Sequence, residues 1–325
     1  MIKLLKKFGK IGVLMGGCSS EREISLKSGK AVYDALSSQG FDVLAMDIRD
    51  ADYNKIKNLL LEKEINVAFI ALHGKVGEDG LIQSICEEIK LPYTGSDSRS
   101  SRLAFNKVLT QQMLRNSRII VPDSVVFSQQ ENIDLLKVSD TLKSFPLVVK
   151  PSSEGSSIGV NVVKSADALV KAIEHARSFG NEVLIEEFIE GRELTVGILD
   201  NKPLEVVEIL TDSVFFDFKA KYESGQTSYK VPADLPIEIK HLMQETALKV
   251  HFLAGCRDLS RIDFILDHTF KPYVLEINTI PGFTQSSLLP KAASYAGISF
   301  NQLCVTLTEL AYAKTKKENL SIVDN

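Results

Sequence analysis

Two neighbouring stretches near the C-terminus carry most of the structural information in this chain: Arg261-Ile262-Asp263-Phe264-Ile265-Leu266 and Tyr273-Val274-Leu275-Glu276-Ile277-Asn278. Both are typical of β-strands, and the turn-forming residues between them predict a hairpin. If its ends, 267 and 272, lie opposite each other, antiparallel pairing places Asp263 opposite Glu276. The same register places Arg261 opposite Asn278.

Because side chains alternate between the two faces of a strand, this hairpin has a polar and an apolar face. We expect the apolar face to pack on a core; it carries Ile262, Phe264, Leu266, Tyr273, Leu275 and Ile277. The polar face carries two carboxylates, an amide and an arginine, which are costly to bury unless other groups satisfy them. A hard cation, bound through these oxygens and through nucleotide phosphates, would satisfy them, and the arginine would take developing negative charge. The alternative is a solvent-facing strand pair with an ordinary ion pair.

The composition is that of a globular protein with a substantial core. The chain has 325 residues, more than the ~100–200 typical of one domain, and 44% of them are hydrophobic. Its 42 acidic and 38 basic residues give a net charge of -4, which provides no basic footprint for nucleic acid. We find no apolar run near the ~20 residues that span a bilayer and no signal peptide, which favours a cytoplasmic protein without a membrane partner. The cysteines are widely spaced, which predicts reduced thiols at Cys18, Cys86, Cys256 and Cys304.

Strands and helices alternate over the first part of the chain, which predicts a parallel sheet and an α/β domain. The expected strands are 11–15, 41–47 and 67–72, and the expected helices are 21–38 and 54–63. After residue 103 the pattern changes to strands at 124–127, 147–150, 160–163 and 182–188, with a helix at 166–177. Strands dominate again after residue 190, before helices at 237–253 and 301–314. We therefore predict three blocks: 1–103, 104–190 and 191–325.

The loop Lys150-Pro151-Ser152-Ser153-Glu154-Gly155-Ser156-Ser157-Ile158-Gly159 joins two apolar strands. Its small residues allow backbone N–H groups to surround a phosphate, and Lys150 adds a positive charge. A flexible hairpin tip is the alternative interpretation. The chain has no Gly-Lys pair followed by Ser or Thr, so we exclude a P-loop NTPase.

The loop Gly16-Gly17-Cys18-Ser19-Ser20-Glu21-Arg22-Glu23 follows a strand and opens a helix. Ser20 and Glu23 have the spacing of a capping box, which gives Glu23 a structural role. Glu21 has no such role and lies at the carboxyl edge of a parallel sheet, where these folds bind ligands. The loop lacks the G-x-G-x-x-G pattern, which argues against a nicotinamide enzyme.

Three further loops each allow a functional and a structural interpretation. His73, in the glycine-rich loop 73–80, is expected either to bind a ligand or to fix the loop. Tyr222, in the polar loop 219–229, belongs either to a lid that excludes water or to the ordinary surface. Ser287 either helps to hold a carboxylate at a helix start or caps that helix.

Taken in order, these segments resemble the D-alanine–D-alanine ligase family of the ATP-grasp superfamily. The match runs from about Ile11 to about Leu310, nearly the whole chain. Its most specific pieces are Gly16-Gly17…Glu21…Ser25, His73…Gly77-Glu78-Asp79-Gly80, Glu154-Gly155-Ser156-Ser157, Lys221-Tyr222, and Arg261…Asp263…Glu276…Asn278…Pro281-Gly282. The resemblance implies an N-terminal parallel-sheet α/β domain (1–103) that binds substrate. A central (104–190) and a C-terminal (191–325) ATP-grasp subdomain follow, and ATP is held between their two β-sheets.

The resemblance also implies which residues bind the nucleotide. Lys107 and Lys150 match lysines on the ATP phosphates, and Lys221 matches a γ-phosphate contact. The stretch Glu186-Glu187-Phe188-Ile189 matches the adenine-binding segment, and Glu193 matches the ribose contact. Two Mg²⁺ or Mn²⁺ ions are implied, with ligands at Asp263, Glu276 and Asn278.

The amino-acid substrates are assigned by the same resemblance. Glu21 matches the group that binds the ammonium of the first D-alanine, with His73 beside it. Ser156 and Tyr222 match its hydrogen-bonded partners, and Arg261 matches the residue that stabilises the acyl phosphate and the tetrahedral species. Three residues match the seat of the second D-alanine: Gly282, Ser287 and Leu288.

The implied activity is ATP-dependent ligation of two D-alanine molecules for peptidoglycan precursor synthesis, by a homodimer. The chain departs from close relatives at Asn106, where an aspartate is frequent, and at Phe188, where some relatives have tryptophan. Three alternative functions are a D-alanine–D-lactate ligase, a ligase of other acids and amines, and a nucleotide-binding regulator without catalysis. The pair Lys221-Tyr222 argues against the first rival, the loops at Glu21 and Ser287 against the second, and the complete catalytic set against the third.

Overall fold

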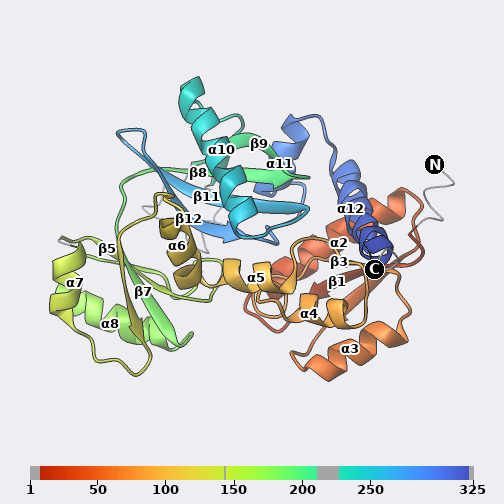
Figure 1. Ribbon diagram of the computed structural model, residues 1–325, viewed down its shortest axis with the longest axis horizontal. Coiled ribbons are helices and arrows are strands. Elements are labelled where there is room, and N and C mark those ends of the chain that lie inside the picture. The colour runs from red at the N-terminus through yellow and green to blue at the C-terminus, as the bar shows by residue number, and fades with distance from the viewer. Residues whose placement is uncertain (1–7, 143, 211–226, 322–325) are drawn as a thin grey trace.

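The computed structural model describes residues 8–142, 144–210 and 227–321, with side chains as far as residue 314. Its strands form three sheets in a row (Figure 1), with the central block at the left, the C-terminal sheet in the middle and the N-terminal sheet at the right. This arrangement confirms the expected N-terminal parallel-sheet α/β part, followed by two further β-sheets. The block boundaries at 103 and 190 stay a prediction.

The N-terminal sheet is parallel, as the alternation of strands and helices predicts. Its strands have the order β2 (Val43–Ile48), β1 (Ile11–Gly16), β3 (Val67–Ile70). The helices of this part are α2 (Arg22–Ser38), α3 (Tyr53–Glu62) and α4 (Leu81–Glu88). The predicted capping box is wrong: Glu21 is the residue that precedes α2, and no side chain caps this helix. Ser19 Oγ instead accepts a hydrogen bond from the Glu21 N–H, at 3.2 Å.

The central block is an antiparallel sheet with helices on one face (Figure 1). Two helices lead to it, α5 (Ser98–Phe105) and α6 (Lys107–Asn116). Its strands have the order β4 (Ser124–Ser128), β7 (Glu182–Glu187), β5 (Leu147–Pro151), β6 (Asn161–Val163), with helices α7 (Leu135–Leu142) and α8 (Ala166–Arg177). Apolar side chains of both helices pack with the strands in one core.

The third sheet has five antiparallel strands. Their order is β10 (Ser228–Lys230), β9 (Lys202–Leu210), β8 (Gly191–Leu199), β11 (Leu259–Asp267), β12 (Pro272–Asn278). Helix α10 (Ile237–Leu253) packs on one face of this sheet through Met243, Ala247 and Val250.

The predicted hairpin is formed by β11 and β12, and its register is confirmed at the polar end. Arg261 lies opposite Asn278, and Asp263 opposite Glu276. At the turn the prediction is wrong by one residue, because a bulge follows Asp263 and Leu266, not Asp267, pairs with Pro272.

The bulge also changes the apolar face of β12. Ile262, Phe264, Leu266 and Ile277 enter the core as predicted. Val274 enters it in place of Tyr273 and Leu275, which are only half-buried. An extra residue reverses which side chains face inward, since the side-chain period of a strand is two.

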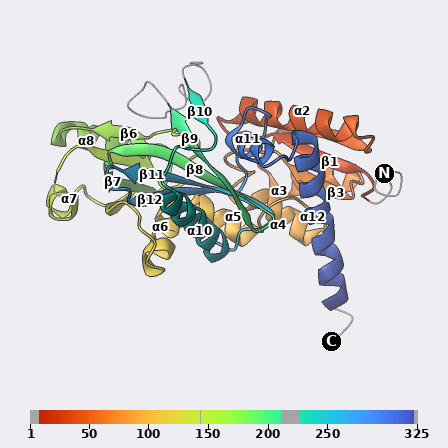
Figure 2. The ribbon, with the colours of Figure 1, turned by 90° about the horizontal axis from the view of Figure 1, so that it is seen from above.

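The end of the chain returns to its beginning. Helices α11 (Leu288–Tyr295) and α12 (Phe300–Ser321) follow the third sheet, and α12 lies beside α2 (Figure 2). Leu303, Leu307 and Ala311 of α12 share one core with Val13 and Val32 of the N-terminal part. The first and last elements of the chain are therefore held together by apolar packing.

Two further sequence predictions concern surfaces and thiols. Within the described part of the chain, none of the helices is both long and apolar enough to cross a membrane. All four cysteines are free thiols, as their spacing predicts; Cys18 is exposed and the others are buried.

Candidate active site

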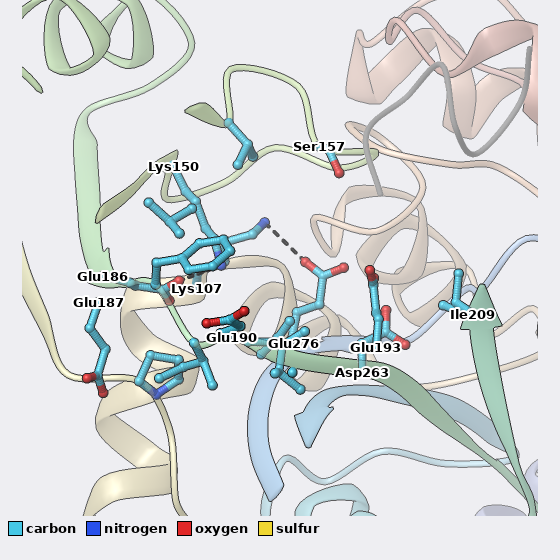
Figure 3. Close-up of a pocket in the computed structure, with 18 of the residues that line it drawn as sticks. Lys107, Lys150, Ser157, Glu186, Glu187, Glu190, Glu193, Ile209, Asp263 and Glu276 are labelled. Carbon is cyan, nitrogen blue, oxygen red and sulfur yellow. Dashed lines mark ion pairs between the residues drawn. The ribbon is translucent and has the colours of Figure 1, made fainter. Parts of the chain in front are cut away.

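A cavity of about 470 Å³ lies between the central sheet and the C-terminal sheet (Figure 3). Strands β5 and β7 line one side, and β8, β9, β11 and β12 line the other. Eight of the residues that the resemblance assigns to nucleotide or metal line it: Lys107, Lys150, Glu186, Phe188, Ile189, Glu193, Asp263 and Glu276. The cavity therefore brings together positions from three separate parts of the sequence.

Lys150 is held in this cavity by a buried hydrogen-bonded network. Its Nζ lies 2.5 Å from Glu186 Oε2, and both side chains are almost fully buried. The other oxygen of Glu186 accepts a hydrogen bond from Gln111 Nε2, at 2.5 Å. Ser124 donates to the amide oxygen of Gln111, at 2.7 Å, which turns the amide nitrogen toward Glu186. The network fixes the direction in which Lys150 presents its charge.

Lys107 connects the two sides of the cavity. Its Nζ donates to the backbone oxygen of Glu154 at 2.6 Å and lies 3.7 Å from Glu276 Oε2 (Figure 3). Lys107 opens helix α6, and the side chain of Asn106 caps this helix by accepting from the Leu109 N–H at 3.0 Å. Because asparagine caps helices as well as aspartate does, the departure at Asn106 leaves the position of Lys107 supported.

Asp263 is buried at the centre of the polar face of the hairpin. Both of its oxygens accept from Arg261, from Nε at 2.8 Å and from the terminal nitrogen at 2.6 Å. Asn278 donates to it at 2.9 Å, and Thr195 Oγ1 on the neighbouring strand β8 donates at 2.6 Å. Asp263 is only 6% exposed, so the alternative interpretation of a solvent-facing ion pair is wrong for this residue.

The side-chain oxygens of the hairpin suit a hard cation that nucleotide phosphates also coordinate. Among the described residues, no cluster of three or more His, Cys, Asp and Glu side chains is arranged to hold a metal ion. The carboxylates of Asp263 and Glu276 and the amide oxygen of Asn278 are the kind of donors that Mg²⁺ uses when nucleotide phosphates complete its coordination. The residues present therefore fit a metal that arrives with a nucleotide.

Glu21 reaches this region from the N-terminal part. It is 6% exposed, and its carboxylate accepts a short hydrogen bond from Ser156 Oγ, in the loop beside the cavity. Two glycines make the approach possible: a Cβ at Gly74 or Gly155 would lie 2.6 or 2.5 Å from Glu21 Oε2. The structure thus joins the predicted Glu21–Ser156 pair.

His73 is buried beside Glu21, and Glu78 is partly buried there. His73 Nδ1 lies 3.6 Å from Glu78 Oε1, and Ser19 Oγ donates to the His73 carbonyl at 2.9 Å. Burial raises the pKa of Glu78, the contact with His73 lowers it in part, and the nearby Glu21 carboxylate raises it again. Glu78 belongs to a sequence motif that we noted, but we assigned it no role.

The last segment of the candidate site is the turn before α11. Ser287 precedes this helix without capping it; its Oγ accepts from the Thr284 N–H at 3.0 Å and lies 2.9 Å from Thr284 Oγ1. The simple N-cap interpretation is therefore wrong. Leu288 is buried in the core shared by both ends of the chain, and a Cβ at Gly282 would approach Ser287 Oγ to 3.4 Å.

Lys221 and Tyr222, with residues 219–226 of the predicted lid loop, lie outside the described residues, and the end of that loop is part of strand β10. Sequence reasoning missed Gln111 and Thr195. Both had a signal: Gln111 lies one helical turn after Lys107, and Thr195 lies on a strand that pairs with Asp263.

The fold and the cavity are those of ATP-grasp enzymes. A family model described as the D-ala D-ala ligase C-terminus matches residues 113–309, and one for the D-ala D-ala ligase N-terminus matches residues 10–59 and 49–96. The chain belongs to the D-alanine–D-alanine ligase family.

Relatives agree with this assignment over nearly the full chain. A D-alanine–D-alanine ligase of Geotalea uraniireducens is 42% identical, covering 95% of this chain and 97% of the relative. One of Syntrophotalea carbinolica is 43% identical, covering 90% and 93%.

Solved structures share the fold. A D-alanine–D-alanine ligase of Bacillus anthracis in complex with ATP superposes with a TM-score of 0.84 at 32% identity, covering 95% of this chain and 99% of that one. The D-Ala:D-Ser ligase VanG of Enterococcus faecalis superposes with a TM-score of 0.80 at 31% identity, covering 94% and 99%.

Proposed function

We propose that this protein joins two D-alanine molecules to D-alanyl-D-alanine, converting ATP to ADP and phosphate through an acyl-phosphate intermediate. One observation carries the proposal: the cavity with its two lysines is connected to Glu21 through the Ser156 hydrogen bond. The loop that lines the nucleotide cavity thus also orients the Glu21 carboxylate that is proposed to bind an amino-acid ammonium group. The D configuration of the substrate rests on the family.

In the proposed first step, the carboxylate of the first D-alanine attacks the γ-phosphate of ATP. Lys107 and Lys150 bind the phosphates and offset their charge, and Phe188 and Ile189 contact the adenine, with Glu193 at the ribose. Glu21 binds the ammonium group of this D-alanine, and Ser156 keeps the Glu21 carboxylate oriented. The products of the step are ADP and D-alanyl phosphate.

In the second step, the amine of the second D-alanine attacks the acyl carbon and phosphate leaves. Arg261 stabilises the negative charge on the tetrahedral species. Gly282, Ser287 and Leu288 seat the second D-alanine, and Ser287 contacts its carboxylate. Lys221 and Tyr222 are proposed to close over the γ-phosphate, because an acyl phosphate must be kept from water.

The proposed metal ligands are Asp263, Glu276 and Asn278, for two Mg²⁺ or Mn²⁺ ions. When bound, the ions supply positive charge at the transferring phosphoryl group. We also propose a homodimer that works in the cytoplasm on peptidoglycan precursors. Sedimentation equilibrium tests the dimer: a mass near 36 kDa instead of twice that value would refute it.

Amino-acid-dependent ADP release tests the proposed function. With Mg²⁺ and ATP, we expect turnover with D-alanine alone, formation of the dipeptide, and no turnover with L-alanine alone. D-alanine with D-lactate and D-alanine with D-serine serve as comparisons, because relatives with other second substrates share this fold. Turnover that requires D-lactate or D-serine would show that this compound, and not D-alanine, is the second substrate. The absence of turnover in every mixture would refute ligation of D-alanine.

A further inference from the structure

A closed set of hydrogen bonds connects helix α2 to the turn at 280–283. The Phe283 N–H donates to Ser28 Oγ at 3.3 Å, and Ser28 Oγ lies 2.9 Å from His73 Nε2. On its other side, His73 Nδ1 lies 3.2 Å from the backbone oxygen of Ile280. Ser28 is fully buried and His73 is 3% exposed, so water does not compete for these bonds.

The partners determine the direction of each bond. The Ile280 carbonyl can only accept a hydrogen bond, so His73 Nδ1 carries the hydrogen of this contact. Ser28 Oγ accepts from the Phe283 N–H and lies 2.9 Å from His73 Nε2; its hydroxyl hydrogen donates to this nitrogen when Nε2 carries no hydrogen of its own. All three bonds are satisfied when His73 is the neutral Nδ1–H tautomer.

Apolar packing alone does not orient the peptide groups of this turn. Ile280 and Phe283 enter two different cores, and the Phe283 ring packs 5.6 Å from Phe69 and 5.5 Å from Phe300, centroid to centroid. These contacts place the two ends of the turn. The hydrogen bonds to Ser28 and His73 additionally fix the Ile280 carbonyl and the Phe283 N–H, and with them the intervening Pro281-Gly282.

The same face of α2 also supports Glu21. Ser25, between Glu21 and Ser28, accepts from the Gly16 N–H at 2.9 Å and donates to the Ala71 carbonyl at 2.8 Å. Residues at i, i+4 and i+7 share one side of a helix, so Glu21, Ser25 and Ser28 lie along one stripe. Helix α2 thus positions Glu21 at its N-terminus and, through Ser28 about two helical turns further on, the segment 280–283.

We infer that Ser28 is a positioning residue that sets the distance between the seats of the two amino acids, acting through His73 and the 280–283 turn. The inference rests on the proposed function, in which Glu21 binds the first D-alanine and the segment from Gly282 to Leu288 seats the second. Without the Ser28 hydroxyl, the acyl phosphate still forms. The second D-alanine is then misplaced, and water attacks the acyl phosphate in its place.

The test uses Ser28→Thr and Ser28→Val, a pair of equal shape that differs in the hydroxyl, together with Ser28→Ala. Dipeptide and ADP are measured in the same reaction. We expect Ser28→Ala and Ser28→Val to lower dipeptide formation by about tenfold, the scale of one or two lost buried hydrogen bonds. ADP release should fall less, so that ADP exceeds dipeptide, while the KM for ATP stays unchanged. Ser28→Thr should restore the ratio toward one.

A second readout needs no substrate. Nitrogen-15 spectra of the histidine rings should show His73 as the Nδ1–H tautomer, with its signals assigned by their loss in His73→Asn. The Nε2 signal should move in Ser28→Ala and return in Ser28→Thr. Ser38→Ala, on the exposed end of the same helix, is the control for both measurements.

Three outcomes would overturn the inference: equal behaviour of the Thr and Val variants, a dipeptide to ADP ratio of one in Ser28→Ala, or an unmoved Nε2 signal. Failure of the proposed function is distinct from these. In that case the unaltered protein makes no dipeptide, while the tautomer of His73 and its response to Ser28→Ala remain measurable.

Discussion

Replacing Arg261 with methionine should strengthen metal binding while it abolishes ligation. In the structure both carboxylate oxygens of Asp263 accept hydrogen bonds from the Arg261 guanidinium group, at 2.8 and 2.6 Å. Asp263 is also a proposed metal ligand. A metal ion must therefore displace the guanidinium group before it binds this carboxylate. Arg261→Met removes the competitor and leaves a side chain of similar length.

The size of the effect follows from the two bonds that are displaced. Hydrogen bonds to charged groups contribute about 1.5–3 kcal/mol each, and burial of both side chains places these bonds in that class. The released arginine recovers part of this free energy by hydrogen bonding to water or to the substrate. We therefore take roughly 1.5–3 kcal/mol as the cost of losing both hydrogen bonds together. Since 1.4 kcal/mol is a factor of ten, the Kd for Mn²⁺ should fall by about 10- to 100-fold.

The assay is a titration of Mn²⁺ into the complex with ADP, with free Mn²⁺ followed by electron paramagnetic resonance. Arg192→Met is the matched control, because Arg192 also lines the cavity and binds Glu208 through two hydrogen bonds, at 2.7 and 2.8 Å. Glu208 is not a proposed metal ligand, so this variant should leave the Kd unchanged. An unchanged or weaker Kd in Arg261→Met would show that the arginine does not compete with the metal.

Three further predictions concern a buried histidine, the lysine network and a glycine. Burial lowers the pKa of His251 from 6.5 to about 4, so between these pH values the unfolded chain binds a proton at His251 while the folded protein keeps this side chain neutral. The free energy of unfolding therefore decreases as the pH falls from 6.5 toward 4. Urea unfolding should show a stability loss of roughly 2 kcal/mol from pH 7.5 to 5 that is absent in His251→Leu. Gln111→Leu frees one oxygen of Glu186 and should raise the KM for ATP about fivefold, with the KM for D-alanine unchanged, in steady-state kinetics. Gly155→Ala pushes a methyl group against Glu21 and should raise the KM for D-alanine about tenfold, more than the KM for ATP.

Each of these changes has a matched control. His241→Asn alters an exposed histidine of the same helix and should keep the decline with pH. Gln112→Leu alters the exposed neighbour of Gln111, and Gly180→Ala adds a methyl group where no atom lies within 4 Å. Equal effects in a variant and its control would refute the corresponding argument.

The hairpin at 261–278 shows how far local pattern extends. Alternation along two strands and a turn between them paired Asp263 with Glu276 correctly, although the predicted register at the turn was wrong by one residue, because the bulge after Asp263 offsets that error. The bulge after Asp263 was not predictable, since it exchanges Leu275 for Val274 in the core and both are apolar. The sequence therefore indicated the polar pairs correctly and the inward face of β12 incorrectly.

The capping box at Ser20 and Glu23 failed for a related reason. Its spacing is a local signal, whereas the structure uses Ser19, which binds both the Glu21 N–H and the His73 carbonyl of a distant loop. Tertiary contacts override a local preference when they satisfy the same groups. Gln111, by contrast, was within reach of sequence reasoning, because helical spacing alone aligns it with Lys107.

Ser28 marks the limit of what a single sequence can provide. Its spacing from Glu21 and Ser25 can be counted along a helix, and this predicts that the three side chains share one face. Nothing in that spacing indicates that the face meets the Phe283 N–H, which lies 255 residues further along the chain. The partner is supplied by the third sheet and by α11 and α12, which pack against the N-terminal core. A hydroxyl that looks like an ordinary buried serine becomes, through that packing, the contact that relates the loop proposed to hold one amino acid to the turn proposed to hold the other.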